Sequence, residues 1–211
     1  LPDGEGVADM NSPHSIDILE ARLRGWIDSR AASDPEWQSI ADTIDYAREN
    51  TPGVRDNGEP NFIHPLWIAN AVAAIIEQCE AAGAPPLGKQ AIDLIRVALC
   101  HDLLEDCSHI TRDILADKIG LRAAAGVYNM SFKYYDADGQ LVIKPKPEYE
   151  KDFLSDPLTL IGKYGDRSHN LMTMVDIEQA KLLRVVYNPE KQRVKLNEVS
   201  AFYIPAGDPA V

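Results

Sequence analysis

Apolar residues recur every three or four positions along most of the chain, which is the spacing that predicts amphipathic helices. The first such stripe lies within residues 15–30 and consists of Ile16, Leu19, Leu23, Trp26 and Ile27. Further helices are expected over residues 65–81 and 89–106. The second of these is the most apolar, so we expect it to be the central helix of the fold.

Several helix starts are marked by a capping residue followed by proline. Asp34-Pro35 predicts a helix that runs to about residue 49, and Asp156-Pro157 and Asn188-Pro189 repeat the same signal. Thr111 is expected to cap a short helix that ends near Gly120. The pattern is therefore mainly helical, with a Gly/Pro/Asn loop at 51–61 and one segment that breaks the helical rhythm.

The exception is the segment 131–144, where aromatic and β-branched residues flank Asp136-Ala-Asp-Gly139. This sequence is typical of a tight turn, so we expect a short β-hairpin or an ordered loop there. An Asp-x-Asp-Gly string also begins some calcium loops, but the later acidic ligand positions are missing and a plain turn is favoured. Tyr134 and Tyr135 could stack on a nucleobase or simply pack within the hairpin.

Together these elements predict an all-α fold with one excursion. The chain has 211 residues, a length that suits one domain, and it shows neither an internal repeat nor a second core. We expect a single domain over residues 15–205, with a variable excursion at 131–150, a flexible leader at 1–14 and a tail at 206–211. The leader is acidic and rich in Gly and Pro, which is unlike a secretory or transit signal.

Charge and composition narrow the function further. The net charge is −12, so the chain lacks the basic surface that binds nucleic acid without sequence preference. It has no run of about 18 apolar residues, which argues against a membrane span. The three cysteines, Cys79, Cys100 and Cys107, form no Cys-x-x-Cys pair, and the latter two bracket the most polar window of the chain. This cysteine usage suits a reducing cytoplasm.

That polar window reads CHDLLEDC, residues 100–107, and it directly follows the apolar run of the central helix. If the window is helical, His101 and Glu105 lie four residues apart, as do Asp102 and Asp106. Two adjacent columns of ionisable groups would then point the same way. Such groups are costly at the end of a buried helix unless they bind something. A solvent-facing helix end is the plain alternative.

Two other segments carry groups of the same kind. A histidine closes the polar loop before residue 65, and an aspartate follows the apolar run 158–162. Imidazoles mixed with carboxylates suit Mn²⁺, Fe or Mg²⁺, whereas structural zinc favours cysteines or closed tetrahedral sites. Open positions on such an ion can activate water and polarise a phosphoryl oxygen. The mixed set of four is His64, His101, Asp102 and Asp166.

This order of motifs, H…HD…D, resembles the HD-domain metal-dependent phosphohydrolases. The flanking strings are most similar to the RelA/SpoT-type alarmone hydrolases, including the small free-standing ones. The matching stretches are Arg55-Asp-Asn-Gly-Glu-Pro-Asn-Phe-Ile-His-Pro65, His101-Asp-Leu-Leu-Glu-Asp106, Lys163-Tyr-Gly-Asp-Arg-Ser-His-Asn170 and Pro189-Glu-Lys-Gln-Arg193. They occur in the family's order over roughly residues 45–205.

The resemblance implies an HD-domain helical bundle that holds one Mn²⁺ ion and hydrolyses the 3′-pyrophosphate of (p)ppGpp to give GDP or GTP and pyrophosphate. It implies that the metal ligands are His64, His101, Asp102 and Asp166, and that Glu105 and Asp106 are the catalytic pair that handles the attacking water. It also implies a substrate-binding set, which comprises Arg55, Lys133, Asn170 and Thr173. The expected partner is a small nucleotide, with no nucleic acid or membrane, and an oligomer is compatible with the sequence.

The chain departs from the family in the loop expected to hold the nucleotide. Asp56 stands where a basic residue is frequent, and the usual tyrosine is displaced into Asn61-Phe62. An acid there weakens the attraction for a polyphosphate. The base and the phosphate pattern therefore stay open, and a ppApp-type alarmone or an NADPH-like dinucleotide is an alternative substrate. A non-catalytic module that senses a nucleotide is the alternative from another functional class.

Residues next to these motifs admit plainer explanations. Arg167 could reach a phosphate, but an ion pair within the fold explains it at least as well. For His169 the sequence favours a structural histidine over a catalytic one, and His109 is expected in a loop.

Overall fold

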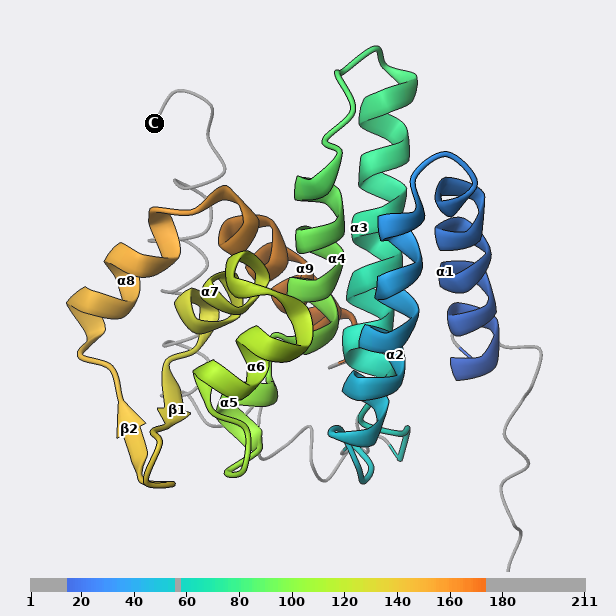
Figure 1. The fold of residues 1–211 in the computed structure, drawn as a ribbon. Coiled ribbons are helices and arrows are strands. Elements are labelled where there is room, and N and C mark those ends of the chain that lie inside the picture. Colours follow the sequence, from blue (N-terminus) through green and yellow to red (C-terminus); the bar gives the residue numbers. More distant parts are fainter. Residues whose placement is uncertain (1–14, 56–57, 174–211) are drawn as a thin grey trace, which may run out of the picture.

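The computed structural model describes residues 15–55 and 58–173, and most of them are helical, as the sequence predicts. The helices follow one another through short connections (Figure 1). In chain order the elements are α1 (Ile16–Ala31), the 3₁₀ helix η1 (Pro35–Gln38), α2 (Ser39–Glu49), α3 (Ile63–Ala81), α4 (Lys89–Cys100), α5 (Leu103–Asp106), α6 (Arg112–Ile119), α7 (Leu121–Met130), β1 (Lys133–Tyr135), β2 (Leu141–Ile143), α8 (Lys146–Leu154) and α9 (Pro157–Thr173).

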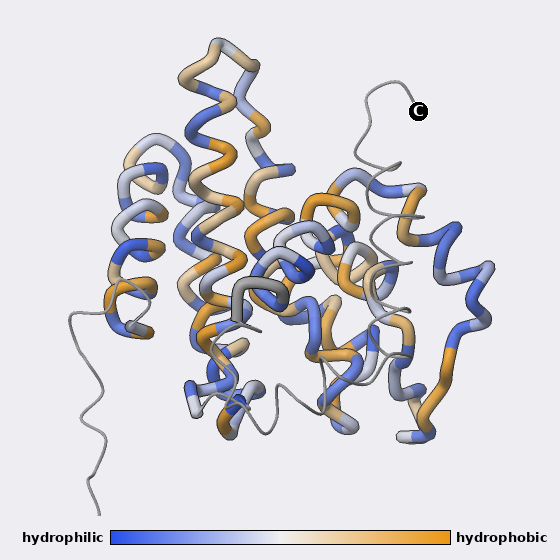
Figure 2. The backbone as a smooth tube through the Cα atoms, turned by 180° about the vertical axis from the view of Figure 1, so that it is seen from behind, coloured by the Kyte–Doolittle hydropathy of each residue, from blue (hydrophilic) through white to orange (hydrophobic). Residues whose placement is uncertain are grey.

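The core is built around α4, which contacts α2, α3, α7 and α9. Every residue from Ala91 to Cys100 is buried except Arg96. This confirms that the helix expected at the centre of the fold is central, although α3 is the more apolar of the two helices. On α1, Leu19, Leu23 and Ile27 are buried, and α1 lies against α3. Hydrophobic residues run along much of α3, whereas α8 at the edge of the molecule is mostly hydrophilic (Figure 2).

Glycines allow α9 to approach its neighbours closely. A Cβ atom on Gly165 would lie 2.7 Å from Ile68 Cγ2 on α3, and one on Gly162 would lie 2.8 Å from Met130 Sδ. Any larger residue at position 165 would therefore push α9 away from α3. Because Asp166 and His169 follow on the same helix, this close approach sets how near their side chains come to α3.

The predicted helix over 89–106 is wrong in one respect. Helix α4 ends at Cys100, His101 and Asp102 form a turn, and the separate short helix α5 begins at Leu103. The backbone N–H groups of Glu105 and Asp106 both donate to the carbonyl of Asp102, at 3.0 Å. The continuous helix is thus interrupted at His101 and Asp102, while the bond from Asp106 to Asp102 keeps that pair one helical turn apart.

The predicted helix starts are confirmed where the structure describes them. Asp34 accepts a hydrogen bond from the N–H of Glu36, Thr111 accepts one from Ile114, and Asp156 accepts one from Leu158. The helix after Asp34 begins with the 3₁₀ turn η1 before α2. The expected start at Asn188-Pro189 lies outside the described residues.

The excursion contains the expected hairpin, in which β1 pairs antiparallel with β2 in the register Lys133↔Ile143 and Tyr135↔Leu141. Its turn is closed by Asp136, whose Oδ1 accepts hydrogen bonds from the N–H groups of Asp138 and Gln140. The remainder of the excursion is helical, because α8 follows directly.

The expected leader at 1–14, the tail at 206–211 and the far end of the predicted domain lie outside the described residues. Within residues 15–55 and 58–173, no helix is both long and apolar enough to cross a bilayer.

Candidate metal centre

His64 enters the core from a polar loop. Between α2 and α3 the chain is closed by a bridge between Val54 and Pro60 and by a hydrogen bond from the N–H of Asn61 to the carbonyl of Gly53. Helix α3 then begins at Ile63, so His64 lies in its first turn. Its side chain is buried and faces the turn that follows α4.

His101 and Asp102 occupy that turn. The imidazole Nδ1 of His101 lies 2.9 Å from the carbonyl oxygen of Ala98. A carbonyl can only accept, so Nδ1 carries a proton and donates it. In the neutral ring this leaves the lone pair on Nε2, which is the atom a metal ion would bind. Asp102 is less enclosed, and 42% of its side chain is exposed.

The ligand-type atoms of these residues converge. His64 Nε2 lies 3.2 Å from His101 Nε2, and Asp102 Oδ2 lies 3.0 Å from His101 Nε2. One such atom from each of the three residues falls within 4.8 Å of the others. His64, His101 and Asp102 therefore form a group, largely buried, that could bind a metal ion.

Asp166 adds a second carboxylate from α9. Its Oδ1 lies 3.3 Å from His64 Nε2 and 4.0 Å from His101 Nε2, while its Oδ2 lies 2.9 Å from Lys163 Nζ. The amide of Asn170 also donates to Oδ1 of Asp166. The structure thus brings all four residues of the predicted ligand set to one place, from α3, α9 and the turn after α4.

The ionisable groups of the cluster shift one another's pKa values. Burial disfavours the charged form of His101, but Asp102 and Asp166 outweigh it and raise the pKa of His101 to about 9. For Asp166, burial opposes ionisation, yet His64 and Lys163 hold the pKa of its carboxyl well below the usual range. Burial lowers the pKa of His64. Near neutral pH, a cation entering this cluster would have to displace the proton on His101.

Glu105 and Asp106 lie on α5, just beyond the cluster. Glu105 Oε1 accepts a 2.7 Å hydrogen bond from the N–H of Phe132, the residue before β1, so the hairpin holds this carboxylate in place. Asp106 is exposed, and its Oδ1 lies 3.6 Å from Lys133 Nζ. Loss of hydration beside the protein raises the pKa of both carboxyl groups, even though Asp106 is exposed to solvent on one side, and the nearby Asp102 charge raises that of Asp106 further.

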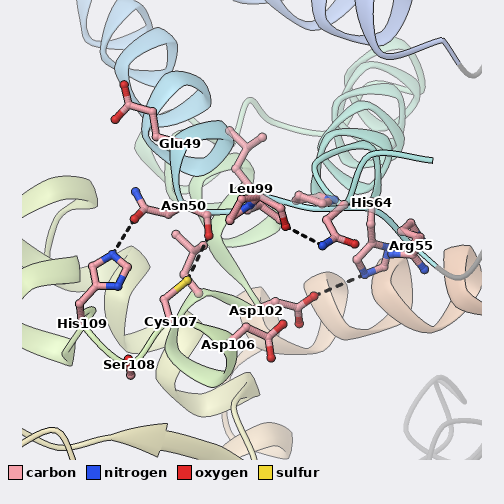
Figure 3. Close-up of a pocket in the computed structure, with 15 residues that line it drawn as sticks. Glu49, Asn50, Arg55, His64, Leu99, Asp102, Asp106, Cys107, Ser108 and His109 are labelled. Atoms are coloured by element: carbon pink, nitrogen blue, oxygen red, sulfur yellow. Dashed lines mark hydrogen bonds and ion pairs between the residues drawn. The ribbon is translucent and has the colours of Figure 1, made fainter. Parts of the chain in front are cut away.

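A cavity of about 680 Å³ opens beside these residues, and His64, Asp102 and Asp106 line it. Figure 3 shows His64 and Arg55 on one side and His109 with Asn50 on the other. His109 Nε2 lies 2.9 Å from Asn50 Oδ1, and the Cys107 thiol donates to the carbonyl of Asn50. These two bonds join the loop after α5 to the end of α2, so this wall of the cavity is fixed.

Of the four predicted substrate-binding residues, the structure describes the side chains of three, and these lie in two places. Arg55 Nη2 lies 3.2 Å from Asn170 Oδ1, so these two residues meet. Lys133 instead pairs with Asp106. Thr173 ends α9, and its side chain lies outside the described part of the structure.

Two further residues contact the predicted ligand set, although the sequence favoured a structural role for His169 and gave Lys163 no role of its own. Lys163 contacts Asp166, and His169 Nδ1 lies 2.8 Å from His64 Nδ1. Their signal was available, because Lys163, Asp166 and His169 are spaced three apart and therefore share one face of α9. Of the thiols, Cys100 is fully buried, in agreement with a packing role.

Comparisons with known proteins assign no family to this chain. No protein-family model matches the chain, and a search of curated proteins finds no match.

Proposed function

We propose that this protein is a Mn²⁺-dependent nucleotide pyrophosphohydrolase of the HD-domain type, which removes the 3′-pyrophosphate of (p)ppGpp-like alarmones. The observation that carries the proposal is the convergence of His64, His101 and Asp102 beside Asp166 at the wall of a cavity. The resemblance of the motifs to the RelA/SpoT-type hydrolases supplies the substrate class.

The donor set fits the proposed ion. It offers two imidazole nitrogens and carboxylate oxygens without a thiolate, which suits Mn²⁺ better than structural zinc. When bound, such an ion polarises a phosphoryl oxygen and lowers the pKa of a coordinated water. A bound cation would also help to attract the negatively charged nucleotide. The cavity is otherwise acidic, since Glu49, Asp102 and Asp106 line it and Arg55 is the single Lys or Arg among its lining residues.

The reaction requires one proton to be removed and one to be delivered. The oxygen of water bonds to the phosphorus attached to O3′, the P–O3′ bond breaks, and its electron pair stays on O3′, which takes up a proton. Glu105 or Asp106 accepts the proton that the water loses. Because the pKa of each carboxyl group is raised, each is a better base near neutral pH than an ordinary surface carboxylate. The products are GDP or GTP and pyrophosphate.

The test is turnover by the full chain with Mn²⁺ and ppGpp, followed by separation of the nucleotides and assay of pyrophosphate. We expect GDP and pyrophosphate in equal amounts, no product with EDTA, and no product from Asp102→Ala. Glu105→Gln is the matched variant, since it is expected to bind Mn²⁺ normally and to lose turnover. Absence of turnover by the Mn²⁺-loaded chain, or full activity of Asp102→Ala, would contradict the proposal.

A substrate panel then addresses specificity. It should include ppGpp, ppApp, NADPH and nucleotides with a single 3′-phosphate, each with Mn²⁺ and with EDTA. Turnover of another member in preference to ppGpp would assign the chain to that substrate. Tight binding of a nucleotide without any product would instead support the non-catalytic sensing module.

A further inference from the structure

His64 has two ring nitrogens in different surroundings. Its Nε2 faces the candidate metal centre, with His101 Nε2 at 3.2 Å and Asp166 Oδ1 at 3.3 Å. Its Nδ1 points the other way and lies 2.8 Å from Nδ1 of His169 on α9. His169 is itself buried, and its ring packs against Trp67, with centroids 4.9 Å apart.

A single proton must lie between the two Nδ1 atoms. Two lone pairs at 2.8 Å would repel, and two N–H groups would clash, so one imidazole donates and the other accepts. If Nε2 of neutral His64 is to offer its lone pair to a cation, the ring proton must be on Nδ1. His169 is then the acceptor through Nδ1. The bond therefore links the tautomer of His64 to that of His169.

The two histidines of the centre are held by unlike partners. His101 donates through Nδ1 to the carbonyl of Ala98, which can only accept, so the Nδ1 proton is fixed and Nε2 is the atom that binds a metal ion once it is deprotonated. His169 can accept or donate. When Nε2–H of His64 donates to Asp166, Nδ1–H of His169 can donate to Nδ1 of His64. When a cation occupies the centre, the direction of this hydrogen bond reverses, and Nδ1–H of His64 donates to Nδ1 of His169.

Resting on the metal centre proposed above, we propose that His169 is a positioning residue, which accepts the Nδ1 proton of His64 and holds Nε2 of His64 ready for the cation. At other metal sites, a residue that hydrogen-bonds a ligating histidine contributes on the order of 10–100-fold to metal affinity. The plain alternative is that His169 only fills space between His64 and Trp67.

Two substitutions separate these roles. His169→Asn keeps an acceptor oxygen close to the position of Nδ1, whereas His169→Phe keeps a ring against Trp67 and removes the acceptor. Calorimetric titration with Mn²⁺ alone should show roughly a 10–100-fold weaker Kd for His169→Phe and largely restored affinity for His169→Asn. Thermal unfolding of both metal-free variants controls for packing.

A second measurement reports the tautomer directly. ¹⁵N NMR of histidine rings in the Zn²⁺-loaded protein, with Zn²⁺ as the diamagnetic probe, should show His64 protonated at Nδ1 and His169 unprotonated at Nδ1. Equal affinity of wild type and His169→Phe, equal losses in both variants, or an unprotonated Nδ1 on His64 would overturn the inference alone. A wild-type chain that binds neither ion would overturn the proposed function as well.

Discussion

The molecule buries ionisable side chains in two regions that differ in how their charges are balanced. Behind the hairpin, Lys144 is 1% exposed, and its Nζ donates to the carbonyl of Tyr128 at 2.7 Å and to Asp152 Oδ2 at 3.0 Å. The same ammonium lies 3.6 Å from the centroid of the Tyr128 ring. Here the protein itself supplies acceptors for the buried charge, as a structural role requires.

At the candidate metal centre the balance is different. Ligand-type atoms of His64, His101, Asp102 and Asp166 point at one another, and a proton on His101, the ammonium of Lys163 and the amide of Asn170 offset the two carboxylates. The comparison of Lys144 with the candidate metal centre shows that burial of a charged group is by itself a weak sign of function. A surplus of inward-facing acceptors is a stronger one, because it is relieved by an external cation.

The largest expected effect is stabilisation by Mn²⁺. A ligand that binds only the folded state at 100 times its Kd adds about 2.7 kcal/mol to the free energy of unfolding. We expect a shift of that order in urea unfolding with Mn²⁺ and its reversal by EDTA. Asp102→Asn should remove the shift, because it removes a carboxylate from the converging group. An unchanged shift in Asp102→Asn would place the ion elsewhere.

A smaller effect is expected when the balanced region is broken. Lys144→Met keeps the length of the side chain but removes the hydrogen bonds to Tyr128 and Asp152, and we expect the free energy of unfolding to fall by about 1–2 kcal/mol. The measurement is urea unfolding with and without Mn²⁺. The Mn²⁺ shift should stay as in the wild type, and its loss would show that the two regions are coupled.

The smallest effect concerns pH and the N-terminus of α9. Arg122 donates to both carboxylate oxygens of Asp156, which lowers the pKa of Asp156 below its usual 3.8. A lowered folded-state pKa stabilises the fold above the unfolded pKa, and the contribution is lost as the pH falls. Half of the Arg122 side chain is exposed, so solvent reduces the contribution to under about 1 kcal/mol.

The matched variant for this effect is Asp156→Asn, which keeps a capping oxygen for Leu158 and removes the charge. Its unfolding free energy should fall less steeply between about pH 5 and pH 3 than that of the wild type. The difference should be the same with and without Mn²⁺ at pH 7. Parallel slopes in the two proteins would show that the pair contributes nothing measurable.

Much of the fold could be predicted from the sequence, because helix stripes, helix caps and tight turns are determined by residues close together in the chain. The stripe in α1 was predictable from its helical period, and the caps at Thr111 and Asp156 and the hairpin turn at Asp136 were predictable because each satisfies backbone groups within a few residues. The break at His101 was not predictable in this way. The apolar periodicity runs into the polar window without a glycine or proline to mark the end of α4.

For the candidate ligand set, too, the sequence predicted one part and not another: it predicted the residues but not their geometry. Residue types and motif order selected His64, His101, Asp102 and Asp166 from the sequence, and the structure brings them together. The expected geometry was different, because the columns of a continuous helix would have aimed Glu105 with His101. Instead the helix is interrupted at His101 and Asp102, and the hairpin holds Glu105 through the N–H of Phe132. Lys133, predicted to contact the substrate, pairs with Asp106.

By itself, then, the sequence determined the helical architecture, the central helix and the kinds of side chain available for chemistry, because periodicity and residue type are local properties. Tertiary structure alone decided which atoms face one another: the contact of His64 with His169, the approach of α9 to α3 at Gly165, and the joining of Arg55 to Asn170. Those contacts join segments up to 115 residues apart, and only the packing of the helices brings them together.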